Sequence, residues 1–488
     1  MPRLGVAYSL DQKTVIRAGF GIFFIPNFVS FGVNPYIDPV SSSTNPFFAS
    51  NDGGLTPAST LHDSDCTLSG GVLSCATPGP FGATLVVPPG RSPQPSVSGY
   101  ALSLKDVAAT GYTVQKNGSV QQWNLDLQRE LPAGFFVDVA YAGAHGVHLP
   151  QFDTNINQIP ESLITEAGAQ AAQGLTPTIA QVVPLANYPF SPALSGSLAP
   201  GNLKQGQLDR PFPQYTNLRL NGQGCCGSNY HSLQATLARR FSGGGTMLVA
   251  YTNAKLLSTT DSLTSWLEGS GTGGVADIQN WNNLKAERSL ASQDVSQRLV
   301  ISYVLDLPFG RGKTFLSDVS GVSDKLVSGW GVDGVTIFQR GFPLKIHYGA
   351  GTPLSALGVL GKSTLRPNVV AGCDRGRPAG VSQLSQWFNT ACFVAPPDWG
   401  FGDESRVDPI LRQKGVNNFD FAIFKRTTFG PSERMNVEFR TEFFNLFNHA
   451  QFAAPNGVCC TSNNANFGVV TATLGNPRLI QFGLKFAF

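Results

Sequence analysis

The sequence predicts an all-β protein: an antiparallel, up-and-down transmembrane β-barrel with long extracellular loops. Three observations support this prediction. Segments that alternate between apolar and polar residues recur about eleven times along the chain. Charged residues make up 13% of the chain, against about 25% in ordinary soluble domains, yet no apolar run approaches the roughly 18 residues of a spanning helix. Short and long connections alternate between the segments, as they do in outer-membrane barrels.

The alternating segments are long enough to cross a bilayer as tilted strands, which takes about 9–11 residues. In chain order we expect strands at 3–10, 14–24, 121–130, 134–143, 230–241, 245–256, 298–307, 331–346, 417–428, 434–447 and 479–488. The last strand places alternate apolar residues on one face, namely Ile480, Phe482, Leu484, Phe486 and Phe488. This C-terminal pattern resembles the signal by which outer-membrane barrels are recognised, so we expect the barrel assembly machinery and outer-membrane lipid as partners.

The connections predict which ends of the strands share a side of the membrane. Tight links at 11–13, 131–133, 242–244 and 429–433 have the composition of hairpin turns. They alternate with long connections at about 25–120, 144–229, 257–297, 347–416 and 448–478. The link 308–330 is the exception, because it is longer than a periplasmic turn should be. If the last strand ends in the periplasm, every long loop lies on the cell surface.

The cost of burying charge predicts which face of each strand meets lipid. A charge facing lipid near the midplane of a barrel costs roughly 2–4 kcal/mol. The cheaper arrangement of 435–444 therefore turns its apolar residues outward and its charged residues, Glu438, Arg440 and Glu442, toward the lumen. These three side chains either pair with charges on neighbouring strands or on a plug, or line water; a salt-bridged wall is the favoured interpretation. Aromatic residues near the expected strand ends fit the girdles of a barrel: Tyr8, Phe23, Trp123, Tyr141, Tyr251 and Trp330.

All eight cysteines lie between the expected strands. An even number confined to loops favours disulfides in an oxidising compartment. We expect Cys66 to pair with Cys75, and Cys373 with Cys392. The vicinal pairs Cys225-Cys226 and Cys459-Cys460 could link two loops to each other, but the sequence does not fix their connectivity. A zinc site is the weaker alternative, because paired C-x-x-C motifs with histidine at finger spacing are missing.

Composition and motifs give no support to an enzyme, a cofactor or nucleic-acid binding. The net charge of +3 is spread along the chain without a block of Lys and Arg. Gly361-Lys362-Ser363 and Gly312-Lys313-Thr314 imitate the end of a phosphate-binding loop but lack its first glycine. His145 and His148 could supply two metal ligands only if a carboxylate joined them, and a solvated loop is the favoured interpretation. We therefore predict no catalytic, cofactor-binding or metal-binding residue.

Several longer motifs resemble those of one family. The hairpin Gln121–Pro132 with Val139-Ala140-Tyr141-Ala142-Gly143 resembles the Oar-like TonB-dependent outer-membrane receptors. So do Tyr230–Gln234 with Arg239-Arg240-Phe241, and Glu287–Leu290 leading to Tyr303–Gly310. The set is completed by Phe338-Gln339-Arg340-Gly341-Phe342-Pro343 and Arg440–Asn448. These motifs span nearly the whole chain in the order of the family.

The resemblance implies a barrel of about 22 strands, closed by an N-terminal plug, in the outer membrane of a Gram-negative bacterium. Such a receptor takes up a large or scarce solute, such as an iron chelate, an oligosaccharide or a peptide, with energy passed through TonB. On this interpretation residues 1–488 are the C-terminal part of the barrel domain, and the signal peptide, the plug and the first strands are absent. The TonB system would then be a partner through the missing plug.

Two other functions fit the same sequence. A surface adhesin could use the barrel only as an anchor, and uptake that stops when TonB is deleted would separate it from a receptor. A secreted all-β protein that binds or cleaves glycans could bury the same apolar faces in a core. Cell fractionation separates that alternative, because a secreted protein would not follow the outer membrane.

Overall fold

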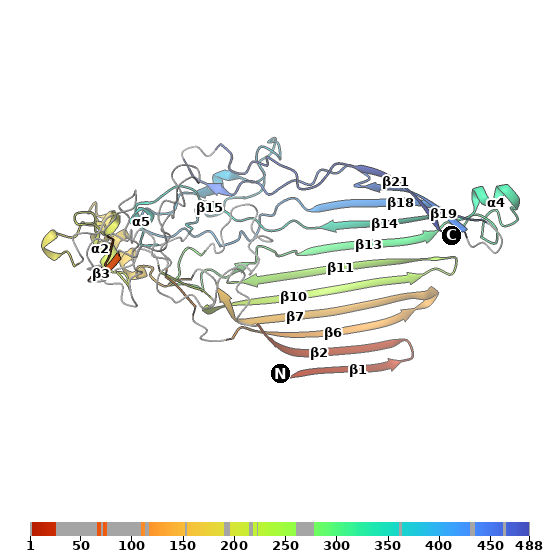
Figure 1. Cartoon of the computed structure of the whole chain (residues 1–488), viewed down its shortest axis with the longest axis horizontal. Coiled ribbons are helices and arrows are strands. Elements are labelled where there is room, and N and C mark those ends of the chain that lie inside the picture. Colours follow the sequence, from red (N-terminus) through yellow and green to blue (C-terminus); the bar gives the residue numbers. More distant parts are fainter. Residues whose placement is uncertain are drawn as a thin grey trace.

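The strands form one large meander, and its order along the sheet is the order along the chain (Figure 1). The computed structural model describes residues 2–25, 66–69, 72–75, 109–112, 117–151, 154–189, 196–213, 218–221, 223–259, 278–360, 364–429, 435–461 and 465–487. The neighbouring strands are β1 (Arg3–Asp11), β2 (Thr14–Phe24), β6 (Ser119–Leu131), β7 (Phe135–Gln151), β10 (Gln223–Arg240), β11 (Gly245–Ser258), β13 (Gln297–Asp306), β14 (Trp330–Gln339), β18 (Val416–Phe429), β19 (Met435–Phe444) and β21 (Leu479–Ala487). Each strand expected from the sequence is present, so the all-β prediction is confirmed.

Every neighbouring pair in this order is antiparallel. The short strand β12 (Ser289–Leu290) adds to the sheet beside β11. In the described part of the chain the sheet is open, with β1 and β21 at its two edges. Figure 1 shows the N-terminal strands at one edge and the C-terminal strands at the other.

Two strands end earlier than the alternation predicts. β14 stops at Gln339 rather than 346, because Pro343 has no N–H for a sheet ladder and Leu344 and Ile346 are buried among the loops. β19 stops at Phe444 rather than 447, because Asn445 takes a left-handed backbone conformation (φ 53°). The Asn445 N–H then donates to Asp420 Oδ1 at 2.9 Å, which closes a turn instead of extending the ladder.

Two other strands run further than predicted. β7 continues to Gln151 and β10 begins at Gln223, and the two pair through register shifts around Cys226. Cys225 and Cys226 therefore lie inside a strand, which corrects the prediction that all cysteines sit between strands. His145 and His148 also lie within β7 rather than in a loop. Alternation does not predict this extension, because glycines interrupt the pattern on both strands.

The short turns gather at one end of the sheet and the long connections at the other (Figure 1). The exceptional link 308–330 lies at the turn end and contains the helix α4 (Gly321–Val327). Lys325 Nζ donates to the Thr428 carbonyl at 2.9 Å, which ties this helix to the end of β18. The additional residues of this link therefore form a small ordered element on the turn side. The link still joins two strands at the same end of the sheet as the short turns.

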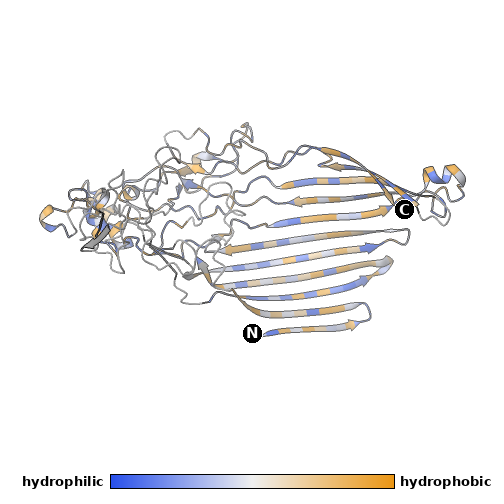
Figure 2. Cartoon of the chain, in the orientation of Figure 1, coloured by the Kyte–Doolittle hydropathy of each residue, from blue (hydrophilic) through white to orange (hydrophobic). Residues whose placement is uncertain are grey.

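Register across the sheet keeps one face apolar and the other polar. Tyr141 stands opposite Leu125 and Leu233, for example, while Asp138 stands opposite Gln128 and Thr236. Hydrophilic and hydrophobic bands follow one another along several strands of the sheet in Figure 2. Large side chains on the apolar face remain exposed, among them Leu4, Val6, Tyr8, Leu125, Leu127, Leu233, Phe439, Phe482, Leu484 and Phe486. An exposed apolar face of this extent is what a lipid-facing wall requires.

Phe23 is an exception among the aromatic residues expected to form girdles. It lies on the polar face, because it is an even number of residues from Arg17, which stands opposite Asp126. The Arg3 guanidinium sits 4.7 Å from the centre of its ring. Trp123, Tyr141 and Trp330 do lie on the apolar face, where their registers place them beside Gly143, Leu233 and Lys425.

The long connections fold into small elements and pack together. We call the described residues within 154–213, 278–296, 340–415 and 445–470 the loop cap. Its elements are α1 (Glu161–Ala172), α2 (Gln205–Leu208), α5 (Pro353–Ala356), β8 (Thr154–Asn155), β15 (His347–Tyr348), β16 (Asn368–Val369), β17 (Phe393–Val394), β20 (Val458–Cys459) and the 3-10 helices η3 (Thr178–Ala180), η4 (Leu185–Asn187), η5 (Gly196–Leu198) and η6 (Thr390–Cys392). The remaining elements are β3 (Cys66–Ser69), β4 (Val72–Cys75), β5 (Ala109–Tyr112), β9 (Leu218–Asn221) and η2 (Pro132–Gly134). Among the described helices, none is long and apolar enough to cross a membrane.

Candidate functional site: the polar face and the loop cap

A charged network occupies the polar face near its C-terminal edge. Arg440 on β19 donates from Nη2 to Asp333 Oδ2 at 2.8 Å, which reaches across β18 to β14. The same guanidinium lies 3.2 Å from Glu442 Oε1 and 3.4 Å from Glu438 Oε1. Arg426 on β18 donates to Glu438 Oε2 at 2.7 Å. The three charges singled out from the sequence are thus joined to one another and to β14, which agrees with the salt-bridged arrangement favoured there.

The network holds strands together as well as presenting charge. Asp333, Ala422 and Glu442 stand opposite one another across β14, β18 and β19, so Arg440 lies where three strands meet. Each pair remains partly exposed, with side-chain exposures of 28% for Arg440 and 16% for Glu438. Pairs of this exposure contribute about 0–1 kcal/mol each. The polar face therefore carries a hydrated, charged wall rather than a buried ion cluster.

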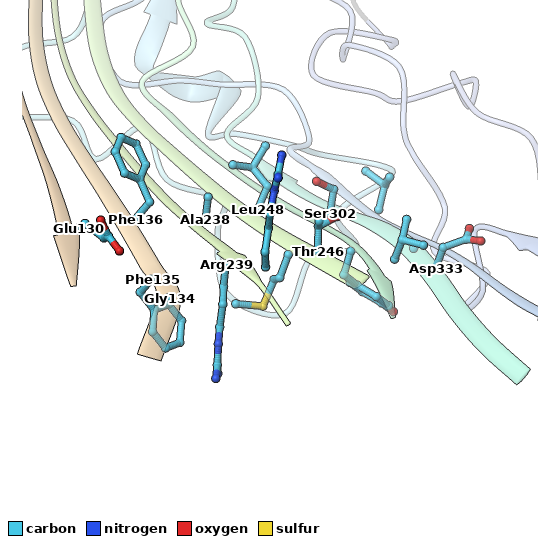
Figure 3. Close-up of a pocket in the computed structure, with 16 residues that line it drawn as sticks. Glu130, Gly134, Phe135, Phe136, Ala238, Arg239, Thr246, Leu248, Ser302 and Asp333 are labelled. Atoms are coloured by element: carbon cyan, nitrogen blue, oxygen red, sulfur yellow. The ribbon is translucent and has the colours of Figure 1, made fainter. Parts of the chain in front are cut away.

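An apolar patch interrupts the polar face at the turn end. Phe136, Ala238 and Leu248 stand opposite one another on β7, β10 and β11. Together with Glu130, Asp333 and Arg240 they line a pocket of about 590 Å³. Figure 3 shows Phe136, Leu248 and Ser302 on one side of the strands, with Phe135 and Arg239 on the opposite side.

The loop cap has its own apolar core, in which separate connections meet. One cluster combines residues 159–179 from the β7–β10 connection with residues 354–365 from the β14–β18 connection: Ile159, Ile164, Ala167, Ile179, Leu354, Val359, Leu360 and Leu365. A second joins the β14–β18 connection to the β19–β21 connection. In it Phe388, Phe393 and Phe467 meet edge to face, with ring centres 5.1–5.8 Å apart. The β14–β18 connection is therefore the common partner of the other two.

Buried ion pairs tie a further connection into the cap. Arg366 donates from Nη1 to Glu287 Oε2 at 2.6 Å, and both side chains are almost completely buried. Arg406, which is 1% exposed, donates to the Glu287 carbonyl at 3.2 Å and to Ser258 at the end of β11. Arg412 donates to Asp294 Oδ2 at 2.6 Å, and Asp294 accepts the Leu256 N–H of β11 at 2.7 Å. The cap is thus anchored to the strand end by specific polar contacts.

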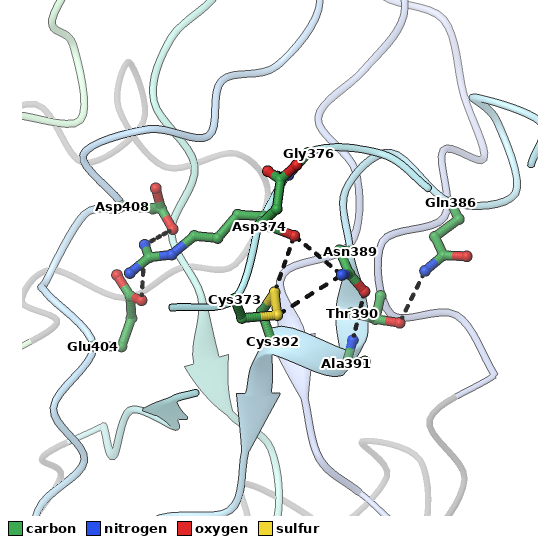
Figure 4. The surroundings of a disulfide bond; sticks show 11 residues. Cys373, Asp374, Gly376, Gln386, Asn389, Thr390, Ala391, Cys392, Glu404 and Asp408 are labelled. Carbon is green, nitrogen blue, oxygen red and sulfur yellow. Dashed lines mark hydrogen bonds and ion pairs between the residues drawn. A yellow bond between two sulfur atoms is a disulfide. The ribbon is translucent and has the colours of Figure 1, made fainter. Parts of the chain in front are cut away.

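Two acidic side chains share one guanidinium beside a disulfide (Figure 4). Arg375 Nη1 lies 2.5 Å from Asp408 Oδ2 and 3.3 Å from Glu404 Oε2. Both carboxyl groups are buried, and Glu404 Oε2 makes no hydrogen bond within the described part of the chain. Burial, with the nearby charge of Asp408, raises the pKa of Glu404 to about 7 against the opposing effect of Arg375. The loop cap therefore contains a group that changes charge near neutral pH.

The structure joins Cys373 to Cys392, the pairing expected from the sequence. It also joins Cys459 to Cys460 and leaves Cys225 and Cys226 as free thiols with their sulfurs 2.9 Å apart. The sequence left the connectivity of the two vicinal pairs open, and in the structure each pair stays within its own segment of the chain. Backbone register places Cys66 opposite Cys75, but their side chains lie outside the described residues, so that pairing stays a prediction.

A second pocket, of about 430 Å³, lies where β11 meets the loop cap. Its lining includes Lys255, Arg288 and Arg412 but only one carboxylate, that of Asp294. Arg412 is paired with that carboxylate, and Arg288 donates to Asn229 Oδ1 at 3.0 Å. The pocket therefore has an excess of positive charge at the junction between wall and cap.

The sequence anticipated the wall but not the cap. Alternation identified the charged face of β19, whereas the apolar cores of the cap have no period that sequence analysis can detect. The only local signals were buried-type residues inside long connections, such as Phe388, Phe393 and Phe467. Glu287 and Arg366 are 79 residues apart, and nothing in the sequence indicated that the two side chains pair. Within the described part of the chain there is no group of three or more His, Cys, Asp or Glu residues suited to a metal ion.

Comparison with known proteins adds the following. Residues 1–481 match the family model described as "Outer membrane beta barrel domain". No curated protein matches the chain. Solved structures with similarity include the outer membrane transporter YddB from Escherichia coli (TM-score 0.41, 7% identity, 97% of this chain and 38% of that one). Another is the pyoverdine outer membrane receptor FpvA from Pseudomonas aeruginosa PAO1 (TM-score 0.37, 9% identity, 100% and 36%). The chain thus spans less than two fifths of the length of each of these proteins.

Proposed function

The chain belongs to the outer membrane beta-barrel domain family, and from this premise we propose that it supplies barrel wall and surface loops to a TonB-dependent receptor. The protein lies in the outer membrane of a Gram-negative bacterium. In our proposal the apolar face meets lipid, the polar face lines the lumen, and the loop cap captures a large or scarce solute on the cell surface. The resemblance of the motifs along the whole chain to Oar-like receptors supports the involvement of TonB.

The observation that carries the proposal is the joining of separate long connections into one packed cap. Loops that only closed hairpins would need no shared core, because each could remain solvated. Here the β14–β18 connection buries Leu360 against Ile159 of one connection and Phe393 against Phe467 of another. A rigid surface body at the mouth of a barrel suits the capture of a solute before it passes through the barrel. The loops are already ordered, so binding does not have to offset the conformational entropy of ordering them.

The charge of the junction pocket favours an anionic solute. Lys255 is exposed there, and Arg288 lies beside it without a carboxylate partner among the described residues. An anionic iron chelate or an acidic oligosaccharide or peptide fits this excess of positive charge. Within the solute classes considered from the sequence, we propose an anionic member.

Uptake by intact cells tests the function. Cells that express the protein are supplied with labelled anionic chelates, acidic oligosaccharides or acidic peptides, and cell-associated label is followed with time. We expect one class to accumulate only when both the protein and TonB are present. Surface binding that is unchanged by loss of TonB, with no accumulation of any class, would contradict uptake and favour the adhesin.

Variants of the junction pocket test its part in the same assay. Replacing Lys255 and Arg288 together by glutamine should raise the solute concentration needed for half-maximal uptake by about tenfold, which corresponds to roughly 1.4 kcal/mol of binding. Lys313, which lies on the turn side and donates to the Gly243 carbonyl, provides the control. Lys313→Gln should leave uptake unchanged. Equal uptake by all variants would remove the junction pocket from the proposal.

A further inference from the structure

An arginine lies on the apolar face at the turn end of the sheet. Arg239 is the penultimate residue of β10 and stands opposite Phe135 on β7 and Met247 on β11. Its guanidinium carbon lies 4.5 Å from the centre of the Phe135 ring and 4.6 Å from that of Phe241. Two aromatic rings therefore contact one cation, which holds its plane in a defined position. Figure 3 shows Arg239 and Phe135 extending together from the strands, away from Phe136 and Leu248.

This cation lacks the partners that other arginines of the sheet have. On the polar face Arg440 and Arg426 each contact carboxylates. Among the residues that the structure describes, no carboxylate lies within ion-pair distance of Arg239. Its Nε is buried and has no hydrogen-bond partner among the described residues. The two rings contribute attraction but accept no N–H in place of an anion, so the two Nη groups, which are not among the buried unpaired atoms, are the donors available to a ligand.

The position of Arg239 places it where lipid headgroups meet the apolar face. Leu237 and Val137, one step further from the turn on the same face, stand opposite each other. Beyond Arg239 come Phe241 and the turn Ser242–Gly244. A second cation lies on the same face near the turn end, because Lys425 Nζ sits 5.4 Å from the Trp330 ring centre. That amine already donates to the Ser328 carbonyl at 2.6 Å, whereas Arg239 has no such bond to any residue in the described ranges.

We propose that Arg239, held between Phe135 and Phe241, binds the phosphate of an anionic phospholipid in the leaflet on the turn side of the membrane. A guanidinium matches phosphate oxygens with two parallel hydrogen bonds, and such bonds strengthen where water is scarce. The acyl chains of the same lipid would lie along Leu237 and Val137. This binding site depends on the membrane location of the protein and does not require the proposed uptake function.

The experiment compares two adjacent arginines on opposite faces. The protein is purified in non-ionic detergent from the outer membrane in which it is assembled. Phosphatidylglycerol or phosphatidylcholine is titrated in, and bound lipid is counted by native mass spectrometry. We expect Arg239→Gln to weaken the first phosphatidylglycerol adduct by about tenfold. Arg240→Gln, next along the chain but on the polar face opposite Thr246, should leave it unchanged. Phosphatidylcholine should bind weakly and equally to all three proteins.

Two further arms separate the sources of phosphate and guard against misfolding. Inorganic phosphate at millimolar concentration should not displace phosphatidylglycerol, since it lacks the acyl chains. Arg239→Lys keeps the charge but loses the planar fork, and it should give an intermediate affinity. The proposal is overturned if Arg239→Gln and Arg240→Gln retain phosphatidylglycerol equally, if both lipids bind alike, or if free phosphate displaces the lipid. If the Arg239→Gln protein does not assemble, the Arg239→Lys protein decides the test. Unchanged affinity of Arg239→Lys for phosphatidylglycerol would also overturn the proposal.

Discussion

At the scale of single residues, Glu404 makes the stability of the loop cap depend on pH. The pKa of this carboxyl group rises from 4.5 to about 7 on folding, so the folded cap holds a proton that the unfolded chain releases between these values. The contribution of Glu404 to stability is therefore fully present below about pH 4.5 and is lost as the pH rises through about 7. The full effect is on the order of 3 kcal/mol.

Glu404→Gln should remove this dependence, because the amide stays neutral at every pH. Proteolysis of the loop cap is to be measured between pH 5.5 and 8.5, with rates corrected for the protease's own pH profile. We expect the parent cap to be cleaved faster at the higher pH and the Glu404→Gln cap to show a flat profile. Matching profiles for both proteins would show that another group is responsible.

The ion pair between Arg366 and Glu287 is a second residue-scale test. Both side chains are buried, so Arg366→Ala leaves an uncompensated carboxylate and should destabilise the cap by about 3–5 kcal/mol. The exposed Arg426, whose side chain is 54% accessible, also pairs with a glutamate. Arg426→Ala should cost at most about 1 kcal/mol. Hydrogen exchange of the cap amides measures the destabilisation by Arg366→Ala. Hydrogen exchange of the β18 amides measures the destabilisation by Arg426→Ala. Comparable losses of stability in the two variants would contradict the role of burial.

At the scale of elements, β10 allows a direct test of which face meets lipid. Leu233 and Gln234 are adjacent, with Leu233 half exposed on the apolar face and Gln234 on the polar face opposite Ala140 and Thr252. Leu233→Arg should destabilise the folded protein in lipid by roughly 2–4 kcal/mol. Gln234→Arg should change stability by less than about 1 kcal/mol. Urea titration in liposomes measures the free energy of unfolding of both variants. An equal loss of stability in the two would contradict the assignment of the apolar face to lipid.

The β14–β18 connection carries the disulfide whose removal tests the cap as an element. Cys373 and Cys392 are 19 residues apart, and closing a loop of this size contributes about 3 kcal/mol. The double variant Cys373→Ala, Cys392→Ala should make the cap sensitive to protease while the strands keep their protection. The free thiol Cys225 supplies the control, because Cys225→Ala breaks no disulfide. Unchanged resistance in the double variant would mean that the apolar cores alone hold the cap.

At the scale of the whole molecule, the two ends of the sheet lie on opposite sides of the membrane. An epitope inserted after Gly380, which is exposed in the loop cap, should be labelled by antibody on intact cells. An epitope inserted after Asp318, in the link that contains α4, should be labelled only after the outer membrane is permeabilised. Labelling of both on intact cells would overturn the assignment of sides.

Much of this architecture was predictable because a strand that crosses a membrane obeys a local rule. Charge facing lipid is costly, so the alternation in β19 and β21 is enforced at each residue and appears in sequence. The rule weakens where the strand leaves the bilayer. For this reason the alternation does not predict that β10 begins as early as Gln223. It also does not predict that β14 ends at Gln339, although apolar residues continue beyond it.

The sequence by itself determined that eleven strands form, their order, and the face of most residues in their membrane-crossing part, since these follow from period and from the cost of charge in lipid. It also led us to expect that Cys373 pairs with Cys392, the bond present in the structure, because both lie in one connection. Only the tertiary structure decided that Arg440 reaches Asp333, that Glu287 meets Arg366, and that the long connections share a core. These contacts join residues far apart in the chain, and no local period or spacing records which distant segments pack together.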